Sequence, residues 1–183
     1  MGVTVKLEGI GNVYQAFEQL AAEIGDKKAT SKVLVPAVRE AMKPVLARAQ
    51  ANAPVDTGGL QLSLQVEARR PTKRDRRSKY ITQTDTVIAS VTTASGKKLA
   101  AMSEGKGLER ARKRLIKLGA TAEQASEFKG IAGDARAMAQ EFGTANMKNH
   151  KPYLRPAIES MAQETVNTLG RVLARRIEQF KRT

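Results

Sequence analysis

The chain has 183 residues, enough for one ordinary domain, and its 41% hydrophobic and 27% charged residues are typical of a globular protein. It contains no cysteine and one histidine, which excludes disulfides, thiol nucleophiles and the usual zinc sites within one chain. With 32 Lys and Arg against 18 Asp and Glu, its net charge of +14 predicts attraction to nucleic acid or to acidic protein surfaces.

Two apolar patterns open the chain. Val3, Val5 and Leu7 alternate with polar residues, which predicts a first strand. Apolar residues then recur every three or four positions from Val13 to Ile24, which predicts a helix that stops near the following glycine. We expect this helix to pack on the sheet.

A second helix is predicted to run to about Ala51, with Thr30 or Ser31 as its N-cap. Pro36 fits the first turns of such a helix. Pro44 lies well inside it and removes a backbone hydrogen bond, so we predict a kink there or two separate helices.

The middle of the chain predicts two paired strands. Turn-forming residues at 53–59 precede apolar residues that alternate from Leu60 to Val66, as in a strand. Residues 82–93 are rich in Thr, Val and Ile and predict the partner strand. Between them, residues 67–80 hold seven Lys or Arg against two acids and have no apolar periodicity, so we expect an exposed, mobile basic loop.

Residues 97–133 predict a basic helical insertion after the strands. Apolar residues keep helical spacing from Leu108 to Leu118, and Thr121 can cap a short segment that ends near Phe128.

The last third of the chain predicts two helices. Ala135–Glu141 forms a short one, and a loop then passes His150, expected to be an exposed loop residue, and closes at Pro156. From Ala157 to Phe180 helical spacing persists over about six turns, which predicts a long final helix.

These elements indicate an α+β fold: a small antiparallel sheet packed by N-terminal amphipathic helices and a long C-terminal helix, with a basic helical insertion. We expect residues 1–183 to form a single domain. No apolar run approaches the roughly 18 residues that span a bilayer, so no membrane association is expected.

The sequence offers no catalytic constellation. Its acids are spread beside Lys and Arg, where solvated ion pairs are the simpler explanation, and its glycines build neither a dinucleotide fingerprint nor a phosphate-binding loop. We therefore expect a protein that is not an enzyme, with no cofactor, no metal and no small-molecule substrate.

The basic loop supplies the candidate polyanion contacts, because clustered cations release counterions from phosphates on binding. The three tyrosines are scattered, so contact with DNA would be blind to sequence. The competing account is contact with acidic neighbouring subunits, or plain solvation. The candidate residues are Arg69, Arg70, Lys73, Arg74, Arg76, Arg77 and Lys79.

Two motifs point to a family. One is Asn52-Ala53-Pro54-Val55-Asp56-Thr57-Gly58-Gly59-Leu60 with Ser63; the other is Glu141-Phe142-Gly143-Thr144 followed by Pro152-Tyr153-Leu154-Arg155-Pro156-Ala157. With the strand pattern at 3–9, they resemble the siphophage neck or tail-completion family of the lambdoid type. The motif residues with a structural role are Pro54, Asp56, Thr57, Gly58, Glu141, Phe142, Gly143, Thr144, Pro152, Arg155 and Pro156.

Simple chemistry assigns roles within these motifs. Asp56 can accept backbone hydrogen bonds in its own turn, and Gly58 tolerates a positive φ at the entry to a strand. We further expect Phe142 to be buried at a loop mouth, and Arg155 to pair with Glu141.

The resemblance implies a structural protein that completes the tail and forms part of the neck joining head and tail. It implies a closed ring of six copies, tail-terminator or tail-tube proteins and head-closure or connector proteins as partners, and contact with the genome end as a further option. It also implies residence in the virion, and in the host cytoplasm during assembly. The basic loop and the helical insertion exceed the compact family pattern.

Two other functions compete with this interpretation. A sequence-nonspecific nucleic-acid-binding protein would explain the charge and would bind DNA with a steep salt dependence. A prophage toxin or processing enzyme would need a catalytic cluster that the single histidine and dispersed acids do not form.

Overall fold

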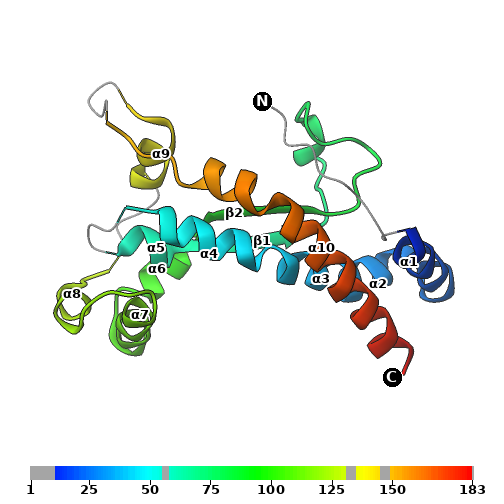
Figure 1. Ribbon diagram of the computed structural model, residues 1–183, viewed down its shortest axis with the longest axis horizontal. Helices are drawn as coiled ribbons and strands as arrows, with labels where there is room; N and C mark the ends of the chain where they lie inside the picture. Colours follow the sequence, from blue (N-terminus) through cyan, green and yellow to red (C-terminus); the bar gives the residue numbers. More distant parts are fainter. Residues whose placement is uncertain (1–10, 55–57, 131–134, 145–148, 183) are drawn as a thin grey trace. The chain divides into compact units, whose positions relative to one another are not determined.

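The computed structural model describes residues 11–54, 58–130, 135–144 and 149–182 (Figure 1). The chain divides into two compact units: the first comprises 1–44, 66–90 and 161–183, and the second comprises 45–65 and 91–160. Over the described residues the structure is mostly helical with a small two-stranded sheet, so the α+β class is confirmed. The strand predicted at 3–7 and two motif residues, Asp56 and Thr57, lie outside the described residues.

The first unit begins with the predicted amphipathic helix, α1 (Gly11–Ile24). It ends at Gly25, whose φ of 87° is a conformation that only glycine adopts without strain. Next come α2 (Asp26–Ala29), a π-helical turn η1 (Thr30–Leu34) and α3 (Val35–Ala41) without a break. The helix therefore starts four residues before Thr30, and the predicted N-cap at Thr30 or Ser31 is wrong.

Two prolines shape these helices. Pro36 has no N–H and its ring crowds the preceding turn. The chain adapts by widening that turn, and the N–H of Val35 bonds the carbonyl of Thr30, five residues back. Pro44 falls in the first turn of a new helix, α4 (Lys43–Asn52), separated from α3 by Met42. The expected break at Pro44 is confirmed in its two-helix form.

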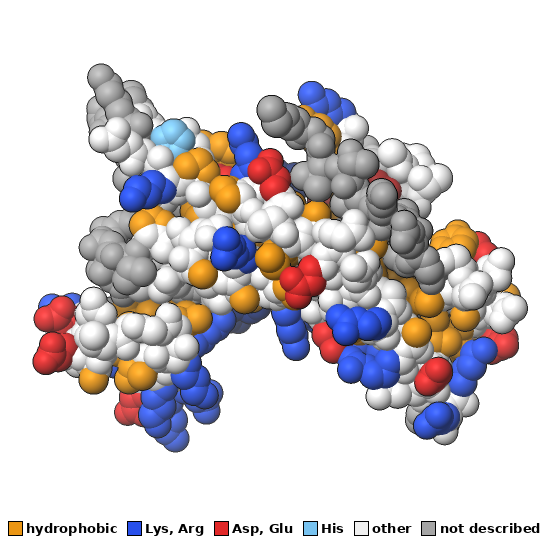
Figure 2. All heavy atoms as spheres, viewed as in Figure 1, with side chains coloured by type: hydrophobic (Ala, Val, Ile, Leu, Met, Phe, Trp, Pro, Cys, Tyr) orange, Lys and Arg blue, Asp and Glu red, His pale blue; other side chains and the backbone are white. Residues whose placement is uncertain are grey.

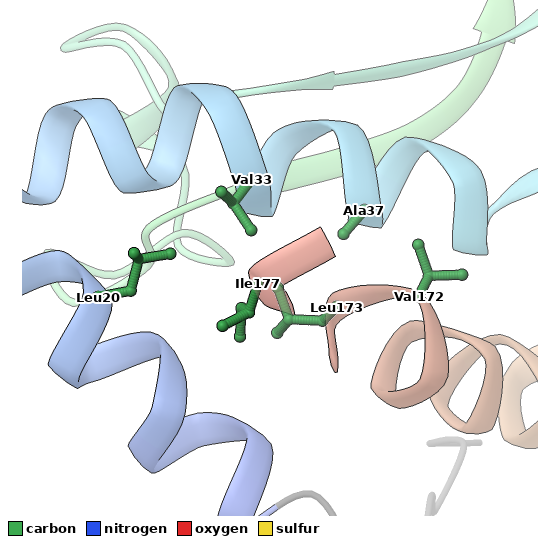
Figure 3. Packing of buried hydrophobic residues seen from close by; sticks show 6 residues of the cluster. All are labelled: Leu20, Val33, Ala37, Val172, Leu173 and Ile177. Atoms are coloured by element: carbon green, nitrogen blue, oxygen red, sulfur yellow. The ribbon is translucent and has the colours of Figure 1, made fainter. Parts of the chain in front are cut away.

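The core of the first unit joins these helices to the long helix α10 (Leu154–Lys181). Figure 3 shows side chains from α1, η1, α3 and α10 pointing toward one another. Burial of each Leu, Val or Ile there contributes about 1.5–3 kcal/mol. The fully or nearly buried residues are Leu20, Val33, Ala37, Val172, Leu173 and Ile177.

Charged contacts reinforce this packing. The Glu40 carboxylate on α3 accepts hydrogen bonds from Arg175 and Arg176 on α10, at 2.5 and 2.8 Å. The hydrogen bond from Arg175, followed by that from Arg176, lowers the pKa of Glu40. Arg39 donates to the carbonyl of Ala68 at 3.0 Å, which ties α3 to the first strand.

The sheet has two antiparallel strands, β1 (Leu64–Arg69) and β2 (Ile88–Thr93). Both begin later than the alternating pattern predicted. Residues 59–63 form a short helix, α5 (Gly59–Ser63), so the expected strand start at Leu60 is wrong. Buried side-chain amides hold this turn, because Gln50 and Gln61 each donate to the other's backbone carbonyl at 2.9 Å.

The second unit contains α6 (Gly96–Ala101), α7 (Gly105–Lys117), α8 (Ala122–Glu127) and α9 (Ala135–Phe142). The predicted cap of α8 is confirmed: Thr121 and Gln124 form a reciprocal capping box. The core of this unit lies between α5, α7 and α8. Its buried residues are Leu62, Ala111, Leu115, Ala125 and Phe128.

Candidate functional site

The basic loop, residues 67–80, starts inside β1 and carries a 3-10 turn, η2 (Asp75–Arg77). Asp75 organises it. Its carboxylate accepts from Arg69 at 2.9 Å and from the backbone N–H and hydroxyl of Thr72 at 2.7 and 2.6 Å. Hydrogen bonding from Arg69, then from Thr72, holds the pKa of Asp75 well below its usual range.

A second set of bonds closes the far side of this loop. The Arg76 guanidinium donates to the backbone carbonyls of Thr82 and Asp85, at 2.5 and 3.2 Å. The Asp85 carboxylate accepts in turn from the N–H of Thr82 at 2.7 Å. Lys79 lies 5.0 Å from the ring centre of Tyr80, a cation–π distance.

The seven predicted polyanion contacts thus fall into two groups. Arg69, Arg76 and Lys79 interact with their own loop. The others have exposed side chains with no hydrogen bond or ion pair to the described part of the chain: Arg70, Lys73, Arg74 and Arg77. Four of the seven cations therefore have no internal partner among the described residues.

The second basic stretch, 97–117, forms α6 and α7, and two of its cations have internal partners. Lys98 donates to the side chain of Gln65 at 3.0 Å. Arg112 donates through two nitrogens to the carbonyl of Phe128, at 3.2 and 3.1 Å, and fastens α7 to the segment after α8. The remaining cations of α7 are exposed, and Figure 2 shows Lys and Arg side chains projecting from this part of the surface.

The first sequence motif is described at its two ends, on either side of residues 55–57. Gly58 is buried with a φ of 70°, and a Cβ on it would lie 2.3 Å from a methyl carbon of Leu115. Any side chain there would displace the core residue of α7. Pro54 lies next to buried Ala53 and is itself half-buried. The turn thus leads into α5, not directly into a strand.

The second motif caps the long helix α10. Glu141, a buried residue of α9, accepts hydrogen bonds from the backbone N–H groups of Tyr153, Leu154 and Arg155 at 2.8, 2.9 and 3.2 Å. These N–H groups have no partner within the helix, and the carboxylate also suits the positive end of the helix dipole. The contact with Arg155 runs through its backbone, so the expected side-chain pair is corrected.

The charge of Glu141 also affects Tyr153. Burial of the phenol, followed by the negative charge of Glu141, raises the pKa of Tyr153 to about 12. This tyrosine is 1% exposed and precedes the first residue of α10. The motif therefore assembles a buried junction between α9 and α10.

The other residues of this motif take various positions. Phe142 is 62% exposed, so its expected burial is wrong. Gly143 ends α9 with a φ of 76°, and a Cβ on it would meet the His150 ring at 2.7 Å. Pro156 lies in the first turn of α10, where a missing N–H costs nothing. Thr144 and Pro152 are exposed.

The part of the chain that the structure describes holds neither a candidate metal site nor a membrane-spanning helix. Across 11–54, 58–130, 135–144 and 149–182, no three His, Asp or Glu side chains gather into a group that could hold a metal ion. Among these residues no helix is long and apolar enough to cross a membrane.

Comparison with known families adds a finding for the N-terminal half. Residues 15–104 match the family described as "Bacteriophage HK97-gp10, putative tail-component". The resemblance to a phage tail family is confirmed. The match supports a structural role in a bacteriophage tail, with a place in the virion among other tail or neck proteins.

The matched range covers just under half of the chain. It runs from within α1 to the residues after α6 and ends at residue 104, immediately before α7. The second motif and the basic helix α7 therefore lie beyond it. No curated protein and no solved structure matches the chain significantly.

Proposed function

We propose that this chain is a structural, non-enzymatic protein that completes a phage tail and forms part of the neck between head and tail. The observation that carries the proposal is the tail-component match over residues 15–104. The second motif lies outside that range, and its residues resemble the neck and tail-completion pattern; in the structure its Glu141 binds the backbone at the start of α10.

Assembly as a ring of six copies is part of the proposal. Copies that each carry a net charge of +14 repel one another, so an interface between them needs apolar contact. The α9 helix offers such a face: Met138 and Phe142 are 59% and 62% exposed and are four residues apart. Ala137 and Glu141, one position before each, are buried and fix the inward side of the helix.

Further partners follow from a place in the neck. One side of the ring would meet tail-terminator or tail-tube proteins, and the other would meet head-closure or connector proteins. We propose one domain with the helical insertion at 97–133 as its addition to the family pattern, and assembly in the host cytoplasm before residence in the virion.

Light scattering and negative-stain microscopy at moderate salt test the proposal, on the protein alone and with assembled tail tubes. We expect rings, or caps on the tubes. A double variant, Met138→Ser with Phe142→Ser, should remove the rings, whereas the matched double variant Tyr14→Ser with Tyr80→Ser changes two exposed aromatics elsewhere and should keep them. Monomers that ignore the tubes and bind duplex DNA would favour the nucleic-acid-binding alternative instead.

A further inference from the structure

The helix α7 carries a straight row of four cations. Lys106, Arg110, Lys113 and Lys117 follow one another at intervals of four, three and four residues. At about 100° per residue they all fall within roughly 40° of one line along the helix, and they span about 16 Å. All four side chains are exposed. We call this row the α7 stripe.

The opposite side of α7 packs into the core of the second unit, to which α7 belongs. Ala111 and Leu115 are 5% and 1% exposed and pack against Leu62, Ala125 and Phe128. At the start of the helix, a Cβ on Gly107 would lie 1.7 Å from the carbonyl oxygen of Ala101, so α6 and α7 approach as closely as their backbones allow. The stripe is therefore displayed on a rigid support.

The stripe has no internal partners. Among the residues that the structure describes, none of its four side chains has a hydrogen bond or ion pair. The helix has one acid, Glu109, against six Lys and Arg, and it lies about 60° to the side of the stripe. Successive Cβ atoms of the stripe thus stand about 5–6 Å apart, so four like charges share one side of the helix, and an external anion would relieve their repulsion.

We infer that the α7 stripe binds the phosphate backbone of duplex DNA without reading its sequence. Duplex DNA presents a charge every 1.7 Å along its axis, so an unbroken row of cations about 16 Å long always faces several phosphates. An acidic protein would need a matching unbroken row of carboxylates. The stripe contains no aromatic residue, which favours backbone contact over stacking on single-stranded bases.

This inference rests on the proposed function only for the place where DNA is met, at the genome end. It also assigns the contact to a region outside the matched family range, because that range ends at residue 104. The preferred DNA contact is thus α7 and not the basic loop, where three of seven cations are bound internally.

Fluorescence anisotropy with a labelled duplex of mixed sequence, measured from low to moderate salt, tests the stripe. The stripe variant replaces all four cations with Gln, a good helix former. The matched loop variant replaces Arg70, Lys73, Arg74 and Arg77 with Gln and removes the same charge. We expect only the stripe variant to bind DNA much more weakly than the wild-type protein, by roughly tenfold or more. The slope of log K against log salt should also become less negative, by about 3–4.

Two further measurements keep the result interpretable. A charge-preserving variant, with each Lys of the stripe changed to Arg and Arg110 to Lys, should retain the wild-type salt dependence. Circular dichroism should show unchanged helix content in every variant. Equal losses in the stripe and loop variants would overturn the inference, as would a wild-type protein that binds polyglutamate and not DNA.

The two proposals can fail separately. A protein that caps tail tubes while its stripe variant keeps full DNA affinity would overturn the stripe and leave the neck function standing. A protein that forms no rings and caps no tubes, but whose stripe variant loses DNA binding, would overturn the neck function and leave the stripe standing.

Discussion

The basic loop and α7 carry similar numbers of cations and use them in opposite ways. In the loop, Arg69 and Arg76 hold a chain segment in shape by bonding Asp75 and backbone carbonyls. In α7 the backbone is already satisfied by the helix and the shape is held by apolar packing, which leaves most cations exposed. Charge counted along the sequence therefore overstates what this loop can offer to a partner more than it overstates what the packed helix can offer.

The largest expected loss of stability comes from deleting the side chain that anchors α7 in the core. Leu115→Ala deletes a 1% exposed side chain between α5, α7 and α8 and should cost about 2–5 kcal/mol of unfolding free energy. Urea denaturation measures it. The neighbouring Ile116 is 49% exposed, so Ile116→Ala should cost less than about 1 kcal/mol. Equal losses would mean that α7 is not anchored in this way.

The junction before α7 should give the next largest effect. Gly107→Ala places a Cβ against the carbonyl of Ala101, where only backbone movement makes room, and should cost roughly 1–3 kcal/mol. Gly96→Ala is the control, since a Cβ there has open space and should raise the unfolding free energy by up to about 1 kcal/mol and not lower it. An unchanged Gly107 variant in the same denaturation experiment would contradict the close approach of α6 and α7.

The smallest effect concerns the loop alone. Asp75→Asn removes the charge that binds Arg69 and Thr72, so trypsin should cleave the loop several-fold faster while the rest of the chain is unaffected. Glu67→Gln removes a partner that bonds only the Nε of Arg69 and should have less effect. Time courses of digestion at fixed trypsin concentration compare the two. A greater effect of Glu67→Gln would show that Asp75 does not organise the loop.

The same carboxylate predicts a pH dependence. Because the folded pKa of Asp75 is depressed, its contribution to loop order is fully present above the ordinary aspartate pKa, about 3.9. It is lost only as the pH falls through the lower folded value. NMR titration should therefore find the Asp75 carboxyl still ionised at a pH where an unbound aspartate is mostly protonated.

Much of the helical framework could be predicted from apolar spacing, because α1, α7 and α10 each bury one face against a core. The cap of α8 could also be predicted, because Thr121 directly precedes the helix that it caps. The start of β1 could not be predicted in this way. Alternating apolar residues at 60–66 fit a strand, but the hydrogen bonds between Gln50 and Gln61 hold a helical turn at 59–63 first, and this pairing joins residues 11 positions apart.

In the candidate sites, too, local features could be predicted from the sequence and contacts between distant residues could not. The motif containing Glu141 could be located, but not its role, because the three N–H groups that it binds lie 12 to 14 residues away and are brought near only by the fold. Phe142 was placed inside because aromatic residues usually are, although α9 already turns Ala137 and Glu141 inward. The α7 stripe was readable as spacing, but whether its cations had internal partners required the structure.

The long helix α10 has a consequence for synthesis. Its residues Val172, Leu173 and Ile177 complete the core that α1, η1 and α3 begin, yet they follow Ala37 by about 135 residues. At ribosomal rates of about 5–20 residues per second, the early helices wait roughly 7–27 s with an uncovered apolar face. A nascent chain stopped before residue 172 would hold three helices with no core to join, so the newly made subunit is a natural client for chaperones until α10 has emerged.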